Sequence, residues 1–498
     1  PLELAVVAGT ITTSFQDVGS HVNLKSKERG TPNMVLRDEE KIAQLRSYDG
    51  KPIKLTVGLN DFSFADTTPE KVMQEYNKKA SGPWKKPSYQ ASMKLENFDH
   101  MCDDAPKTCL EKAKVFGGKV SGLGFLAHKK VAGEGSELQR KEKQRRLAPM
   151  GFGVPLGFYL KFVEHNAKVN PQFKVLLDKL IQSEKSENGL TPLPTQEKKA
   201  LVHEVKQAFL NGELPAELYN EVYKSVLELK AQVAQKYDGL VLDKLKIRSS
   251  ANVEDIEGFN GAGLHDSYSA KLSKSSPDTP DKACRLEKEM DEGVEEEEVK
   301  PKTLSCAIKA VYASLWNLKA VRERSYQRFD HGGATMGLAI IPSYKFRENQ
   351  GQVISANSVY ITRVVGSPQV YGHQMSAQRG NGLVTNPDPR TRAELITMTF
   401  LTAGERNPSI TVLQHAKPDA EKPSLETTVM PTETIYKHYR IARAVEEAYC
   451  EADERYFPGR KCKDVSNSQK KPMALDMELK AYSDGEVLIK QVRKFTGK

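Results

Sequence analysis

Apolar residues recur at helical intervals in the middle of the chain. Between Thr195 and Tyr237, one stretch has such residues three and four positions apart: Leu218, Val222, Val226, Leu229 and Val233. This spacing predicts an amphipathic helix with a single buried face. A second amphipathic helix is predicted before it, with Gly212 and Pro215 as the stop and the start between the two.

Patterns typical of strands lie at both ends of the chain. Near the N-terminus, "LELAVVAGTITTS" (residues 2–14) predicts strand, turn and strand, "TPNMVL" (31–36) predicts another strand, and a short helix is expected at residues 21–29. At the other end, "LDMELKAYSDGEVLIKQVRKF" (475–495) alternates on both sides of Ser483-Asp484-Gly485, which predicts a tight hairpin. Together these elements predict a mixed fold of class α/β (α+β). We expect the first unit to be incomplete, with strands upstream of Pro1.

Composition and charge narrow the function classes. The 498 residues are 38% hydrophobic and 28% charged, which is typical of a globular protein and not of a disordered or fibrous one. No apolar run approaches the roughly 20 residues of a membrane span. The net charge of +9 is spread along the chain and only weakly favours anionic ligands. One basic run, "LQRKEKQRR" (138–146), is interpreted as a solvated face, so we expect no nucleic-acid partner. The oligomeric state stays open.

The cysteines fall into three pairs that are local in sequence: Cys102 with Cys109, Cys284 with Cys306, and Cys450 with Cys462. None of the pairs has zinc spacing. Each flanks a polar segment, as short disulfide loops do in oxidising compartments. Six reduced thiols in a cytosolic protein are the equal alternative, so the cysteines do not decide the compartment.

Two glycine-rich segments could bind phosphate. "GGKVSGLG" (117–124) offers backbone amides and the mobile charge of Lys119, although a plain glycine-rich turn is the commoner structure. In "KIRSSANVEDIEGFNGAGLHDSY" (246–268), Arg248 can bind phosphate oxygens in a bidentate manner. The acidic pair Glu254-Asp255 and a flexible loop follow it within sixteen residues, which makes this the stronger combination.

The closing hairpin could hold a metal. Alternation places Gln491 and Arg493 on one face of its second strand, and pairing brings Asp476 and Glu478 roughly opposite them. A carboxylate and an amide oxygen suit Mg²⁺, and an arginine suits the phosphate that the metal bridges. An ordinary cross-strand salt bridge is the alternative.

One histidine is a candidate nucleophile. His21 lies in "SFQDVGSHVNLKSKERGTPNM" (14–34). A neutral imidazole can attack phosphorus at neutral pH and so divide one difficult transfer into two. On its own chemistry, a structural role is the commoner one for a histidine.

Taken in order, these segments resemble the dikinase superfamily, which includes pyruvate phosphate dikinase, phosphoenolpyruvate synthase, rifampin phosphotransferase and the glucan, water dikinases. The resemblance rests on "VFGGKVSGLGFL" followed by "VPLGF", on "IRSSANVEDIEGFNGAGLHDSY", on "YASLWNLKAVRERSYQRFDH", and on "DMEL" with "LIKQVRKF". "DVGSHVNLKSKERGTPNM" resembles the swivelling phosphohistidine domain. Because this domain precedes the nucleotide domain here, the domain order is most similar to that of the glucan, water dikinases.

The resemblance implies a domain layout and a set of site residues. A partial swivelling β/β/α phosphohistidine domain (1–60) and a linker (61–111) would precede an ATP-grasp-like nucleotide-binding domain (112–498), with lobes at roughly 112–335 and 336–498. His21 would be phosphorylated, and Glu478 and Gln491 would bind Mg²⁺. The residues implied to bind ATP are Lys119, Arg248, Glu254, Asp255, Gly261, Gly263, Lys319, Arg324 and Arg493.

The implied activity is an ATP- and Mg²⁺-dependent phosphotransfer. The β-phosphate of ATP would pass through His21 to an acceptor, with an α-glucan as one candidate. A related enzyme with a small-molecule or protein acceptor is one alternative. A non-catalytic nucleotide-binding module is another, because "GLAIIPSY" and "SAQRGNGLVTNPDP" depart from the family pattern. The family implies a cytoplasmic or plastid-like location, whereas the cysteine pairs, if oxidised, are compatible with an extracytoplasmic one.

Overall fold

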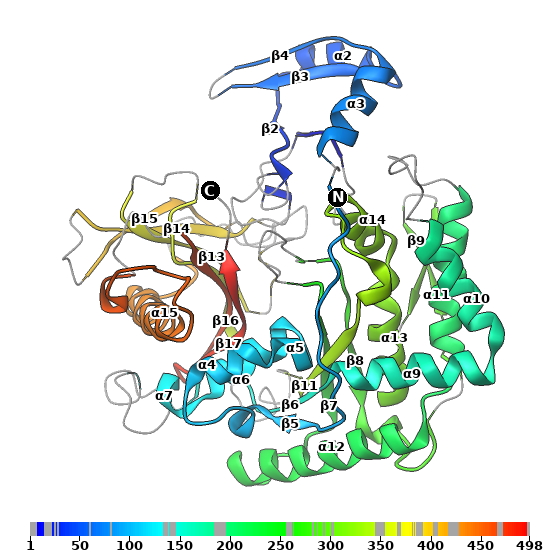
Figure 1. Ribbon diagram of the computed structural model, residues 1–498. Coiled ribbons are helices and arrows are strands. Elements are labelled where there is room, and N and C mark those ends of the chain that lie inside the picture. Colours follow the sequence, from blue (N-terminus) through cyan, green and yellow to red (C-terminus); the bar gives the residue numbers. More distant parts are fainter. Residues whose placement is uncertain are drawn as a thin grey trace.

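A computed structural model gives the arrangement of the chain (Figure 1). It describes all residues except 1–6, 14–21, 24–25, 27–28, 59–60, 80–81, 133–137, 139–145, 184–195, 255–260, 262, 281–282, 285, 292–293, 300–302, 344–353, 366–369, 381, 383, 385–391, 402–406, 417–427, 466–471 and 496–498. Within the described ranges, no helix combines the length and the apolar character that a membrane crossing requires.

A five-stranded antiparallel sheet forms the first half of the main body of the protein. Its strands, in spatial order, are β5 (Glu96–Asn97), β6 (Phe152–Val154), β11 (Met336–Pro342), β7 (Lys244–Ala251) and β8 (Ser267–Lys271). The accompanying helices are α9 (Leu156–Val169), α10 (Pro171–Ser183), α11 (Gln196–Asn211), α12 (Ala216–Lys236), α13 (Leu304–Ala313) and α14 (Leu318–Tyr326). The strands β9 (Leu286–Asp291) and β10 (Val294–Val299) form a separate hairpin.

A six-stranded antiparallel sheet forms the second half. Its order is β15 (Ser409–Gln414), β14 (Glu394–Thr399), β13 (Gly372–Arg379), β12 (Ile354–Ile361), β16 (Ala474–Tyr482) and β17 (Val487–Phe495). The long helix α15 (Thr432–Ala452) shares its hydrophobic core. Short 3-10 helices occur at Phe98–His100, Leu272–Lys274, Ser314–Trp316, His331–Gly333 and Cys462–Asp464.

Among the residues that the structure describes between β5 and β6, four short helices occur, and one of them contacts both sheets. They are α4 (Pro106–Glu111), α5 (Ala113–Phe116), α6 (Gly118–Ala127) and α7 (Lys129–Ala132). Helix α6 packs on β7 and β11 of the first sheet and on β17 of the second. Eight of its ten residues are buried. A residue at the start of α6 therefore lies where the two halves meet.

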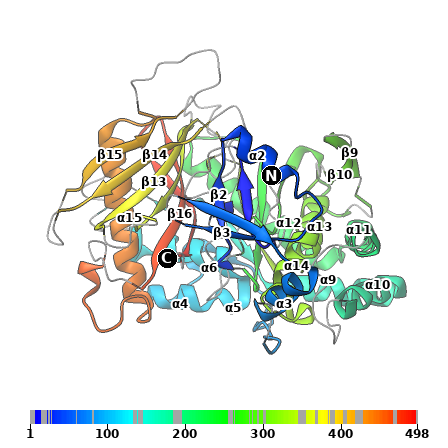
Figure 2. The same cartoon turned by 90° about the horizontal axis from the view of Figure 1, so that it is seen from above.

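The elements between residues 10 and 79 are called the N-terminal unit here. The strands β1 (Thr10–Thr12) and β2 (Asn33–Val35) are parallel, and β3 (Ile53–Val57) pairs antiparallel with β4 (Phe62–Asp66). The helices α2 (Glu39–Arg46) and α3 (Pro69–Lys79) accompany them, and α2 buries none of its residues. Figures 1 and 2 show this unit over the middle of the molecule, between the β13–β15 side and the α9–α14 side.

Several predicted elements are confirmed. The two amphipathic helices are α11 and α12, and all five apolar residues of the predicted stripe on α12 are buried. The closing hairpin is β16 and β17, with Gly485 in the turn at a φ of 83°. The predicted strand at 31–36 is β2. The six cysteines form the three pairs that their sequence order indicates.

Part of the expected linker packs with the elements that follow it. Of residues 61–111, the stretch from Glu96 onward supplies β5, which pairs with β6, and α4, which packs on α6. Phe98 and Met101 are buried in the core that the second sheet shares. This differs from the expectation because the apolar side chains of this polar-looking segment are few but large.

Candidate functional site

The start of helix α6 lies against strand β7. Gly117, at a φ of 82°, turns the chain into the helix, and a Cβ atom there would collide with the carbonyl oxygen of Ser250. The Ser250 hydroxyl accepts a hydrogen bond of 3.1 Å from the amide of Val120 in the first turn. The glycine-rich segment is therefore a helix that begins at β7 and not the open loop or turn that its composition indicates.

The side chain of Lys119 contacts β7 and the residues that follow this strand. Its Nζ lies 3.2 Å from Ser249 Oγ and 2.5 Å from Glu254 Oε1. The side chains of Lys119 and Glu254 are only 9% and 2% exposed. Because a buried charge is costly without a partner, this pair neutralises two groups that water does not reach.

Gly261 lies against Glu254. A Cβ atom at Gly261 would lie 2.6 Å from Glu254 Cγ, so the close approach of these two residues requires glycine. Gly263 has a φ of 70°, which other residues rarely adopt. The structure thus brings together Lys119, Glu254 and Gly261. Asp255 lies outside the described residues.

Strand β7 presents three cations on one face. Lys244, Lys246 and Arg248 alternate with the buried residues Leu245 and Ile247. Because successive side chains of a strand point to opposite faces, the three cations share one side of the sheet. Lys246 donates a hydrogen bond of 2.9 Å to the carbonyl oxygen of Ser267 on β8.

Arg248 links the two sheets. Its guanidinium donates to the carbonyl oxygen of Lys490 (2.5 Å) and to Gln491 Oε1 (3.2 Å), and it lies 3.5 Å from Glu478 Oε2. These three acceptors belong to β16 and β17 of the second sheet. The planar guanidinium of an arginine presents five N–H donors in a fixed fork, whereas a lysine offers three donors on a compact ammonium group.

The hairpin pairs as its alternation predicts. Glu478 lies opposite Gln491, and Asp476 lies opposite Arg493. Arg493 donates to Asp476 Oδ2 from Nε (2.9 Å) and from a terminal nitrogen (2.6 Å). The cross-strand salt bridge that was the alternative is therefore present at this position. Lys490 Nζ lies 3.3 Å from Glu478 Oε2.

The site is strongly cationic around one carboxylate. Burial by itself would raise the pKa of Glu478, but neighbouring cations outweigh burial and hold its pKa well below the usual range; they are Lys490, Arg248, Arg493 and Lys119. Burial, and after it the neighbouring charge of Arg248, lower the pKa of Lys246 to about 8. Burial also lowers the pKa of Lys490, against the opposing effect of Glu478. Adding an anion to this surface would relieve the repulsion between its cations.

The predicted basic residues of α14 have different surroundings. Arg324 is fully buried, donates to His331 Nδ1 (3.2 Å) and the carbonyl oxygen of Leu315 (2.8 Å), and stacks on Trp316. Lys319 Nζ lies 3.9 Å from Asp266 Oδ1, and its side chain is 16% exposed. In this arrangement Arg324 holds its own helix in place.

Two cations of the site were missed by the sequence analysis. Lys246 lies two positions before Arg248 on the same strand face, and Lys490 precedes Gln491 on β17. The alternation of cationic and apolar residues along β7 could have identified Lys246, because it places Lys246 on the same face as Arg248. No comparable signal marks Lys490, because it lies at a register shift between β16 and β17 that regular alternation does not predict. The predicted nucleophile His21 lies outside the described residues.

The donor set fits a metal ion that is shared with phosphate. Glu478 is 28% exposed along its side chain and ionised, and Gln491 faces it with an amide oxygen. The Nε2 atom of Gln491 is buried with no hydrogen-bond partner. Within the described ranges there is no cluster of three or more His, Cys, Asp or Glu side chains that could hold a metal. Mg²⁺ typically takes one or two protein oxygens and completes its shell with water and substrate phosphates.

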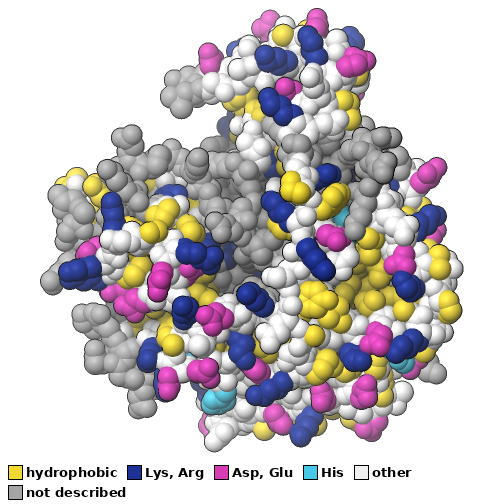
Figure 3. All heavy atoms as spheres, in the orientation of Figure 1, with side chains coloured by type: hydrophobic (Ala, Val, Ile, Leu, Met, Phe, Trp, Pro, Cys, Tyr) yellow, Lys and Arg dark blue, Asp and Glu magenta, His cyan; other side chains and the backbone are white. Residues whose placement is uncertain are grey.

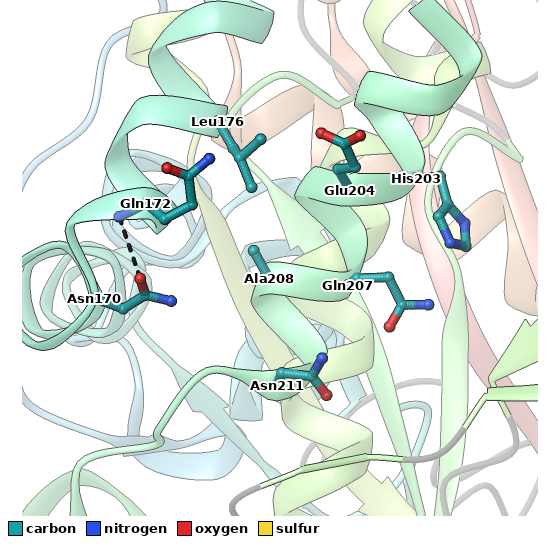
Figure 4. A pocket seen from close by; sticks show the side chains of 8 residues that line it. All are labelled: Asn170, Gln172, Leu176, His203, Glu204, Gln207, Ala208 and Asn211. Carbon is teal, nitrogen blue, oxygen red and sulfur yellow. Dashed lines mark hydrogen bonds between the residues drawn. The ribbon is translucent and has the colours of Figure 1, made fainter.

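Other surface features lie away from these residues. A groove of about 490 Å³ between α10 and α11 is lined largely by amide side chains, and none of the predicted site residues contributes to it (Figure 4). On the face shown in Figure 3, basic and acidic side chains are interspersed and do not gather by sign.

Comparison with known proteins gives one finding. The model of the family described as pyruvate phosphate dikinase, AMP/ATP-binding domain, matches residues 113–376, which is more than half of the chain. The matched range contains Lys119, Arg248 and Arg324, whereas the hairpin with Glu478 and Gln491 lies beyond it. A search of curated proteins finds no match.

Proposed function

We propose, because this chain belongs to the pyruvate phosphate dikinase AMP/ATP-binding domain family, that it is an ATP- and Mg²⁺-dependent phosphotransferase of the dikinase type. The observation that carries this proposal is the position of Arg248. Its guanidinium joins β7, inside the matched range, to Glu478 and Gln491, outside it. A nucleotide polyphosphate bound there would meet cations from both halves of the domain.

The chain's own residues account for triphosphate binding. Arg248, Lys246 and Lys490 would neutralise the phosphate charges, and the start of α6 would add the positive end of a helix dipole beside Lys119. Glu478 and Gln491 would hold Mg²⁺, which neutralises charge on the phosphate oxygens when bound. Phosphoryl transfer depends mainly on such positioning and charge neutralisation.

The proposed transfer uses His21 as a relay. An imidazole nitrogen forms a bond to the β-phosphorus while the bond between that phosphorus and the oxygen of the α-phosphate breaks, so AMP leaves. The γ-phosphate goes to water or another acceptor, and the phosphohistidine donates to the second substrate. In sum, ATP, water and an acceptor hydroxyl give AMP, inorganic phosphate and a phosphorylated acceptor. An α-glucan is one candidate acceptor, and a small molecule or a protein is the alternative.

The test is phosphoenzyme formation with ATP labelled at the β-phosphate. We expect acid-labile label on the protein, dependent on Mg²⁺ and absent from His21→Ala. His203→Ala is a suitable control, because this histidine lines the remote groove on α11. Tight ATP binding without any label would instead indicate a non-catalytic nucleotide-binding module. Transfer of label to soluble glucan, or its failure, then decides the candidate acceptor.

A further inference from the structure

A buried ion pair joins the N-terminal unit to the nucleotide domain. Arg29 donates from Nε to Glu323 Oε1 (3.3 Å), and a terminal nitrogen of Arg29 contacts Glu323 Oε2. The two side chains are 1% and 3% exposed, and 294 residues separate them in sequence. We call Arg29 and Glu323 the docking pair.

The two partners are held on structured segments. On the N-terminal side, the Ser26 carbonyl oxygen accepts hydrogen bonds from the amide (2.9 Å) and hydroxyl (3.4 Å) of Thr31, and Gly30 has a φ of 61°. These contacts fix the turn that follows Arg29 and leads into β2. Arg29 therefore lies within a turn that hydrogen bonds of its own unit close.

Glu323 belongs to the helix that carries two predicted phosphate-binding residues. It follows Lys319 by four positions, which places both on one face of α14, and Arg324 is its neighbour. Arg324 anchors α14 through the carbonyl oxygen of Leu315. The docking pair thus attaches the N-terminal unit directly to a rigid part of the proposed ATP site.

We infer that the docking pair positions the N-terminal unit for transfer from ATP to His21 and lets it leave afterwards. This inference rests on the proposed function. The gain from pairing two buried charges is largely offset by the loss of their hydration, so such a pair specifies one geometry without adding much net affinity. When the unit swings away, both charges regain water. Arg29 and Glu323 are positioning residues, since they hold the unit and do not touch the reacting atoms.

Charge reversal tests the inference. Arg29→Glu and Glu323→Arg each place two like charges together, and the double variant restores an opposite pair in reversed order. Glu323→Gln is the milder variant, because it keeps the shape and removes only the charge. The matched control is Asp104→Lys, which reverses one partner of an exposed pair with Lys129 (2.8 Å). For each variant, the first-turnover rate of labelling from β-labelled ATP, the affinity for ATP and the radius of gyration by X-ray scattering are measured.

We expect each reversal to slow labelling about 100-fold or more and to enlarge the radius of gyration, with ATP affinity unchanged within twofold. The double variant should recover at least tenfold in rate, and Glu323→Gln should lie between. Wild-type labelling rates in both single reversals would overturn the inference. So would slow labelling without recovery in a double variant that still binds ATP.

The proposed function and the docking pair can fail separately. If the unmodified protein takes no label at His21, the proposed function is wrong. The radius of gyration from X-ray scattering then tests the docking pair on its own. Expansion in both single variants with compaction in the double variant would still support docking through Arg29 and Glu323. Equal radii in all variants would refute it.

Discussion

Arg248 is the residue whose replacement should affect ATP binding most. It is the link between the two sheets, with a backbone carbonyl, an amide oxygen and a carboxylate around one guanidinium. Arg248→Lys keeps the charge and loses the fork. Arg248→Met removes the charge as well and keeps an unbranched side chain of similar length.

The expected losses follow from the two bonds that the proposed function assigns to Arg248 and an ATP phosphate. A hydrogen bond to a charged group contributes about 1.5–3 kcal/mol, and a lysine can replace one of the two bonds that an arginine makes to a phosphate. Arg248→Lys should therefore weaken ATP binding by about 2 kcal/mol, which is a factor of about 30. Arg248→Met loses both bonds, so a loss of about 3–4 kcal/mol is expected, which is several hundredfold or more.

Titration calorimetry with ATP and Mg²⁺ measures both variants. Arg146 supplies the control, because its side chain is 14% exposed against 13% for Arg248, and it also binds a carboxylate and backbone carbonyls. Arg146→Lys and Arg146→Met should leave ATP affinity within twofold. If Arg248→Met remains folded by circular dichroism and binds ATP within threefold of the unmodified protein, the assignment of this surface to the phosphates is refuted.

Three further predictions concern the same domain. The pKa of Lys246 is lowered to about 8, so between pH 8 and 10.5 the unfolded chain holds more protons than the folded protein, and the free energy of unfolding should rise with pH. Bound ATP phosphates should raise this pKa. Calorimetry of ATP binding in two buffers at pH 8.5 should therefore detect uptake of up to about one proton, which Lys246→Met abolishes. Leu229→Ala on α12, at a side chain 1% exposed, should lower the free energy of unfolding by about 2–5 kcal/mol in urea titration, whereas Leu227→Ala, at 49% exposed, should cost under about 0.5 kcal/mol. Gly117→Ala should destabilise more than Gly239→Ala in the same assay, because both glycines have φ near 80° but only a Cβ at Gly117 meets a neighbouring strand; equal losses would contradict the close approach of α6 to β7.

Sequence patterns predicted those parts of the fold that depend on local periodicity. The stripe on α12 and the pairing of Glu478 with Gln491 around the Gly485 turn both follow from spacing alone. The glycine-rich segment at Lys119 was ambiguous, because glycine is common both in turns and at helices packed closely against strands. Its helical form depends on the contact with Ser250, which is 130 residues away.

The candidate site was predicted as separate segments and not as an arrangement. Arg248 was singled out for phosphate, but its link to Lys490 and Gln491 spans more than 240 residues and two sheets. Arg324 was singled out by resemblance, yet its burial against Trp316 and Leu315 could not be inferred from neighbouring residues. Periodicity indicates which face of an element a residue occupies, and only tertiary packing determines what that face meets.

The nucleotide released in the first turnover distinguishes a dikinase from a kinase that forms ADP. Enzyme in excess over ATP labelled in the adenine ring is mixed with Mg²⁺, quenched in the millisecond to second range and analysed for AMP and ADP. A dikinase mechanism through His21 predicts a burst of AMP with an equal amount of inorganic phosphate, close to one AMP per ATP bound, and no such burst in His21→Ala. Release of ADP in place of AMP, or an AMP burst that persists in His21→Ala, would contradict it.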